Sequence, residues 1–123
     1  MLRIRPDQLR ALDEPTSEFL ARTEQHLREV WTEECDELGQ TGVREHVLGA
    51  FADARAHGLT SEFDVVRFID LSMAFGRDFP GQAWCVSLFE RTRSEGSAAL
   101  DVDALWRAAE AELDRRDEDR EGP

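Results

Sequence analysis

Few features of this sequence would interrupt or cross-link a helical chain. It has four prolines, eight glycines and two cysteines among its 123 residues, and so few helix breakers leave room for long helices. Cys35 and Cys85 stand apart, without CxxC spacing. Isolated thiols in a cytoplasmic chain are usually buried as small hydrophobes. The spacing leaves a disulfide between them open, and we predict that both thiols are free.

Also absent is any apolar run of the ~20 residues that a membrane-spanning helix needs. The opening segment MLRIRPDQLR lacks the apolar stretch of a secretory signal peptide. We therefore expect a cytoplasmic protein without a membrane partner. The length suits one domain, and 41% hydrophobic with 34% charged residues is typical of a globular protein.

Lysine is missing altogether. All 15 basic residues are arginine, against 27 acidic residues, and the net charge is −12. The acidic residues are unevenly distributed along the chain. Residues 13–38 hold nine acidic residues and two arginines, which is a local net charge of −7. Such a surface repels nucleic acid and anionic membranes and attracts a basic partner. The alternative is a solvated helix face that keeps the protein soluble.

Helical periodicity dominates the remaining pattern. Apolar residues recur at steps of three, four and seven, which predicts amphipathic helices, and no convincing strand pattern is present. We predict an all-α fold: a single domain over residues 1–115 that forms a bundle of about five helices, with a helical hairpin at its centre. A frayed, polar C-terminal tail should follow at residues 116–123. The expected helices cover residues 6–12, 17–38, 41–57, 61–75, about 82–93, and a last helix from about 101.

Several residues mark the expected helix ends. Gly39 should end the helix that begins at residue 17, and Gly58 fits the left-handed closing position of the next one. Ser61, with Asp64 three residues on, resembles a capping box at the start of the third long helix. Gly76 should stop that helix.

The histidines are the first place to look for chemistry. His46 and His57 share a helix face, but eleven residues separate them by about 16 Å, too far for one metal ion. Asp53 and His57 are four residues apart and could pair near a helix C-terminus. Such a pair is more often a cap than a catalytic dyad. Residues 70–81 open like a calcium loop but place Phe75 where glycine is needed. We predict no metal, no cofactor and no enzymatic activity.

The helix at residues 61–75 is apolar almost all round, yet it carries charges at its centre. Asp64, Arg67 and Asp70 are three residues apart in turn, so they share one face. One interpretation is an intramolecular ion network that fixes how this helix docks, since buried charges need partners. The other is that Arg67 or Asp70 reaches a bound partner.

The loop after this helix combines charge with large aromatic residues. Arginine and the larger aromatics are over-represented among interface hot spots. Phe79 and Trp84 could instead fold inward as loop anchors. Our candidate partner-binding residues are therefore Arg67, Asp70, Arg77, Asp78, Phe79 and Trp84. No basic patch is interleaved with exposed aromatics, so we expect no nucleic-acid partner.

The segment GLTSEFDVVRFIDLSMAFGRDF, residues 58–79, resembles a pattern in small uncharacterised bacterial proteins. In that pattern a helix ends at glycine, a Thr-x-Glu-x-Asp start leads into Arg-aromatic-aliphatic-Asp-Leu, and Gly-x-x-Phe follows. The matching residues here are Thr60, Glu62, Asp64, Arg67, Phe68, Ile69, Asp70, Leu71, Gly76 and Phe79. The segments LRIRPDQLRAL and QHLREVW look similar too, so the resemblance covers roughly the first 80 residues, and Pro80-Gly81 departs from it.

Genes of that group often lie among type VI secretion or PAAR-type effector clusters. The resemblance therefore implies an accessory role, as an adaptor, chaperone or immunity protein, and it supplies no catalytic residues. We expect a non-catalytic protein whose partner is a secreted effector or secretion component with a basic surface. The alternatives are an acidic nucleic-acid mimic that inhibits a DNA-binding protein and, more remotely, a small enzyme that uses His57 with Asp53.

Overall fold

The computed structural model describes residues 15–94 and 100–121. In these two ranges it contains five α-helices, one short 3-10 helix and no strand, which confirms the all-α prediction. The helix expected at residues 6–12 lies outside the described residues. The elements are α2 (Ser17–Val30), α3 (Thr32–Ala56), α4 (Glu62–Phe75), the 3-10 helix η1 (Phe79–Gly81), α5 (Val86–Ser94) and α6 (Val102–Glu121).

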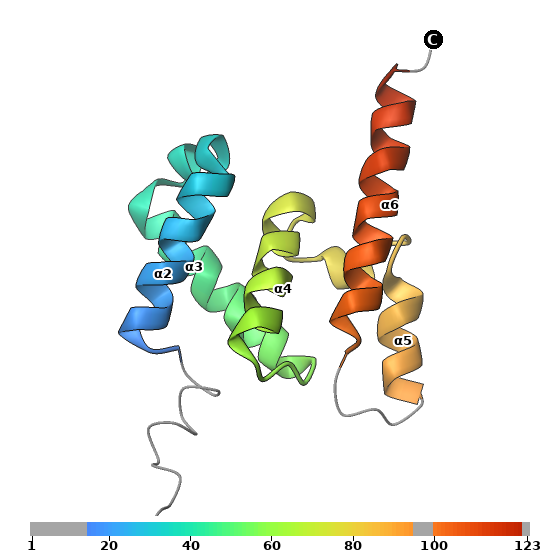
Figure 1. Ribbon diagram of the computed structural model, residues 1–123, viewed down its shortest axis with the longest axis horizontal. Coiled ribbons are helices and arrows are strands. Elements are labelled where there is room, and N and C mark those ends of the chain that lie inside the picture. The colour runs from blue at the N-terminus through green and yellow to red at the C-terminus, as the bar shows by residue number, and fades with distance from the viewer. Residues whose placement is uncertain (1–14, 95–99, 122–123) are drawn as a thin grey trace, which may run out of the picture.

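Helix α4 lies at the centre, with α2 and α3 on one side and α5 and α6 on the other (Figure 1). It packs against α3, α6 and η1, as its nearly all-round apolar sequence requires. Its side chains Phe68 and Ile69 are fully buried. Helices α3 and α4 form the predicted hairpin across the short link after His57.

Helix α2 is held on α3 by one aromatic contact and one ion pair. The ring centroids of Phe19 and Phe51 lie 5.6 Å apart. The buried Glu24 carboxylate accepts hydrogen bonds from Arg44 at 3.1 and 2.9 Å. The earlier residue of α2 contacts the later residue of α3, so α2 lies antiparallel to the second half of α3.

The helix ends follow the sequence signals closely. The Ser61 hydroxyl accepts a hydrogen bond from the Asp64 amide at 3.1 Å, so the predicted cap is formed. Gly58 adopts φ +85°, and the Leu59 amide reaches back to the Ala54 carbonyl at 3.1 Å. This is the closing motif that a left-handed glycine allows. Gly76, at φ +93°, ends α4 as predicted.

Two boundaries differ from the sequence prediction. The helix expected at 17–38 breaks early, at Trp31 (φ −117°, ψ 52°), where the indole N–H bonds to Asp70. The chain is helical again from Thr32 to Gly39, whose angles of φ 76° and ψ 171° are not helical. Gly39 therefore ends a helix as predicted, and α3 consists of two helical segments that meet at this kink. Helix α5 begins at Val86 rather than near residue 82, because residues 82–85 form a turn.

The C-terminal helix is longer than expected. We predicted a frayed tail from residue 116, but α6 is helical to Glu121. Within it, the Glu112 carboxylate receives hydrogen bonds from Arg115 and Arg116 at 2.7–2.9 Å. These i,i+3 and i,i+4 pairs stabilise the polar second half of the helix, and the Arg116 guanidinium also lies 4.8 Å from the ring centroid of Phe75.

Both cysteines are buried and free, in agreement with the prediction. The Cys85 thiol donates to the Phe79 carbonyl at 2.9 Å. Burial, and to a lesser degree the Glu112 charge, raises the pKa of Cys85 to about 12. Burial also raises the pKa of Cys35. At neutral pH both side chains are therefore unreactive thiols.

Candidate functional site

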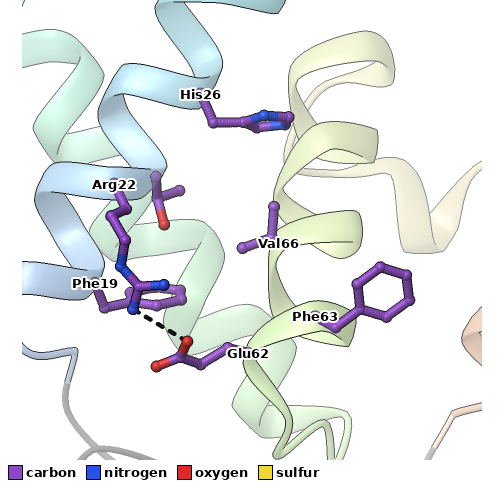
Figure 2. A pocket seen from close by; sticks show the side chains of 7 residues that line it. Phe19, Arg22, His26, Glu62, Phe63 and Val66 are labelled. Atoms are coloured by element: carbon purple, nitrogen blue, oxygen red, sulfur yellow. Dashed lines mark hydrogen bonds and ion pairs between the residues drawn. The ribbon is translucent and has the colours of Figure 1, made fainter.

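A groove lies between α2 and α4, which both pack on α3 and are bridged to each other by long polar side chains. It has a volume of about 290 Å³ and is seen from close by in Figure 2. We call it the α2–α4 groove. Its lining is mostly apolar and consists of Phe19, Arg22, Thr23, His26, Glu62, Phe63 and Val66.

One end of the groove is crossed by an exposed ion pair. Arg22 Nη2 lies 3.1 Å from Glu62 Oε2, and the two side chains are 60% and 56% exposed. An ion pair this exposed contributes only about 0–1 kcal/mol. A ligand can therefore displace this bridge at little cost.

The other end is closed by a firmer contact. Asp70, whose side chain is 14% exposed, accepts a hydrogen bond from His26 Nε2 at 2.9 Å and one from the Trp31 indole N–H at 3.1 Å. Because a carboxylate can only accept, Nε2 of His26 carries a proton. Asp70 thus ties α4 both to α2 and to the break between α2 and α3.

The rim on the α4 side carries an exposed aromatic residue. Phe63 is 69% exposed and follows the cap residue Ser61 by two positions. The Arg67 guanidinium carbon lies 5.1 Å from the ring centroid of Phe63 and 5.1 Å from that of Trp106. Arg67 also donates to Asp103 of α6 at 2.8 Å. The guanidinium is thereby fixed between two rings and supports Phe63 from behind.

The two central charges of α4 therefore serve different neighbours. Arg67 reaches α6 through Asp103, and Asp70 reaches α2 through His26. The three-residue spacing from Asp64 had indicated that these charges pair with one another along α4. In the structure each side chain instead pairs with a residue on a flanking helix. Among the two interpretations from the sequence, this geometry fits the intramolecular network.

The loop residues proposed from the sequence differ in how far the structure buries them. Phe79 is fully buried, which is incompatible with a direct contact to a partner. Trp84 is half-buried against Phe75, with ring centroids 4.5 Å apart, and its indole N–H donates to Gln82 at 2.8 Å. Asp78 remains exposed and accepts from Gln82 at 3.3 Å. The aromatics thus act as loop anchors, because folding them inward buries two large rings.

Arg77 packs onto α3 and binds Asp53. Its Nε and Nη2 atoms donate to the two carboxylate oxygens at 3.0 and 3.2 Å. Gly49 makes this approach possible, since a Cβ at that position would lie 2.3 Å from Arg77 Nη1. The spacing in the sequence suggested that Asp53 pairs with His57. The structure instead gives this carboxylate a bidentate arginine, and the His57 ring packs on Phe89 with centroids 4.7 Å apart.

His46 contacts a serine, but in an arrangement that favours structure over catalysis. Its Nε2 lies 2.8 Å from the Ser72 hydroxyl, which itself donates to the Ile69 carbonyl at 2.6 Å. His46 is therefore the donor to Ser72. Burial, and next the nearby Arg77 charge, lowers the pKa of His46. Ser72 is 1% exposed, so no substrate can reach its oxygen.

Among residues 15–94 and 100–121, no three His, Cys, Asp or Glu side chains are grouped so that they could hold a metal ion. In the same part of the chain, no helix combines the length and apolar character needed to cross a membrane. No family model, curated protein or solved structure matches the chain.

Three residues were not predicted from the sequence: Phe63 and His26, which line the groove, and Trp31, which donates to Asp70 at its closed end. A signal for Phe63 was present, because it precedes Arg67 by four and Asp70 by seven residues and so shares their charged face. An aromatic residue on a charged face is expected to be exposed. Nothing local indicated His26 or Trp31, since their common partner is about 40 residues away.

Proposed function

We propose that this chain is a non-catalytic, protein-binding accessory protein that holds a segment of its partner in the α2–α4 groove. The observation that carries the proposal is the exposure of Phe63 beside this mostly apolar groove. Large exposed apolar residues at a concave site are typical of interaction surfaces. Aromatic and arginine side chains are also the usual energetic centres of protein interfaces.

The rigidity of the rim supports this role. Phe63 is backed by Arg67, which Trp106 and Asp103 hold in place. A side chain that is already ordered loses less entropy when it binds than a mobile one. The exposed bridge between Arg22 and Glu62 can open at small cost, whereas Asp70 keeps the helices joined at the other end.

The kind of partner follows from the resemblance of residues 58–79 to proteins encoded near secretion and effector genes. We propose an effector or secretion component as the partner, with this chain as adaptor, chaperone or immunity protein. The protein acts in this proposal through binding alone and needs no cofactor.

The test is affinity capture from the native cells with three tagged proteins: wild type, Phe63→Ala and Leu48→Ala. Both substitutions remove an exposed apolar side chain, but Leu48 lies on α3 and does not line the groove. We expect one stoichiometric partner with the wild type and with Leu48→Ala, and its loss with Phe63→Ala. Equal capture by all three proteins would refute the groove as the binding site.

A further inference from the structure

The space inside the α2–α4 groove is short. Its two bridges start from Arg22 and His26, four residues apart on α2, which is about 6 Å along the helix. A volume of about 290 Å³ over this length admits one large side chain rather than a whole helix backbone. The occupant must therefore present a single apolar anchor.

A second surface adjoins the Asp70 end of the groove. Trp31, which donates to Asp70, is also the residue at which α2 ends and α3 begins. The next turns carry four exposed acidic residues, none of which forms an ion pair with a residue that the structure describes. We call this surface the acidic corner, and it consists of Glu33, Glu34, Asp36 and Glu37.

The acidic corner is a dense group of carboxylates, whereas other exposed carboxylates, such as those of Glu18, Glu45 and Glu90, stand singly in the described sequence. Elsewhere the carboxylates of Glu24, Asp53, Glu62, Asp103 and Glu112 each have an arginine partner. At the corner, four negative charges lie within five residues. Arg28 lines a small pocket together with Asp36, so at least three of the four charges are left without an arginine beside them. Unpaired charges beside an apolar groove favour a ligand that carries the opposite charge next to its apolar anchor.

We infer that the occupant of the α2–α4 groove is a partner segment with one large apolar anchor and two or more arginine or lysine residues on the side facing the acidic corner. The inference rests on the proposed function and specifies its partner. The corner starts within about two helical turns of the groove, so the basic residues should lie on the order of 10 Å from the anchor. In an extended segment this separation is about three residues.

The experiment is a selection of 12-residue peptides, displayed on phage as a random library, against the full chain. Enriched peptides are then synthesised and their affinities measured with four proteins: wild type, Phe63→Ala, the double variant Glu33→Gln/Glu37→Gln, and the control Glu90→Gln/Glu110→Gln. The control removes the same two charges from exposed positions on α5 and α6. All substituted side chains are exposed, so each variant should fold.

We expect enriched peptides that combine one large apolar residue with neighbouring arginines or lysines. Their affinity should fall about tenfold with Phe63→Ala, as for a moderate hot spot, and about fivefold with Glu33→Gln/Glu37→Gln, and it should not change with the control. Binding by wild type should also weaken as the salt concentration rises, because exposed charges are screened.

Three results would overturn the inference. Enriched peptides that need Phe63 for binding but lack basic residues would show that the partner segment is not basic, while the groove would remain the binding site of the proposed function. Basic peptides that bind Phe63→Ala as well as wild type would point to an acidic mimic of nucleic acid instead. No enrichment at all would also overturn the inference, while the proposed function would still be decided by capture from the native cells.

Discussion

Replacing Asp70 by alanine should detach α2 from α4. The substitution removes the acceptor of the hydrogen bonds from His26 Nε2 and from the Trp31 indole. Each half-buried donor left without a partner costs about 1–3 kcal/mol. Both donors can regain some hydration at the groove, so we expect the free energy of unfolding to fall by about 2–3 kcal/mol in total.

The measurement is urea unfolding followed by tryptophan fluorescence, with thermal unfolding alongside. A loss of this size should lower the melting temperature by roughly 8–12 °C in a domain of this length. Asp70→Asn keeps an acceptor for Trp31 and should lose only about 1 kcal/mol. Glu90→Ala, at an exposed site, should change stability by less than about 0.5 kcal/mol. A similarly small effect of Asp70→Ala would refute the role of this carboxylate as the link between the two helices.

Four further substitutions test the contacts around α3 and α6. Gly49→Ala should push the Arg77 guanidinium away from Asp53. The gain of about 1 kcal/mol in helix propensity then offsets the loss of the partly exposed ion pair, so the free energy of unfolding should change little. In the Gly49→Ala background, Arg77→Ala should have no additional effect on stability. A double-mutant cycle measured by urea unfolding tests this. His46 has a lowered pKa, so the unfolded chain binds a proton that the folded protein does not. The free energy of unfolding should therefore decrease as the pH falls below about 6.5, and His46→Gln, compared by thermal unfolding between pH 7 and 5, should remove that decrease; an unchanged profile would contradict it. Hydrogen bonds from Arg115 and Arg116 lower the pKa of Glu112 to about 2 from its ordinary 4.5. The stability it contributes is present above pH 4.5 and is lost as the pH falls toward 2, so Glu112→Gln should flatten the pH dependence in this window alone.

Most of the fold could be predicted because the helices and their ends are specified by residues close together in the sequence. Apolar spacing located the helical segments, and Ser61, Gly58 and Gly76 marked their ends. Each of these signals acts within one or two turns of the chain, so it can be read without knowing the tertiary structure. The hairpin of α3 and α4 followed from the shortness of their link.

The candidate site could not be predicted in the same way, since its contacts join distant residues. The break at Trp31 was missed because the apolar periodicity continues through it, and the indole is held by Asp70, 39 residues further on. Composition left open whether the loop aromatics contact a partner or fold inward, because the contacts that enclose Phe79, with Phe68 and Phe89, come from other parts of the chain. Phe63 received no predicted role, although it shares the charged face of α4 with Arg67 and Asp70.

The opposite pairing directions of Arg67 and Asp70 have a consequence for how α4 finds its orientation. A helix that is apolar almost all round can bury several faces equally well, so hydrophobic burial leaves its rotation about its own axis poorly specified. Arg67 and Asp70 project about 60° apart around that axis at 3.6 residues per turn, and each meets its partner on a different flanking helix. Any other rotational register would bury one of these charges without a partner, which is costly. The two charges thus select one register of α4, and that register places Phe63 at the rim of the groove.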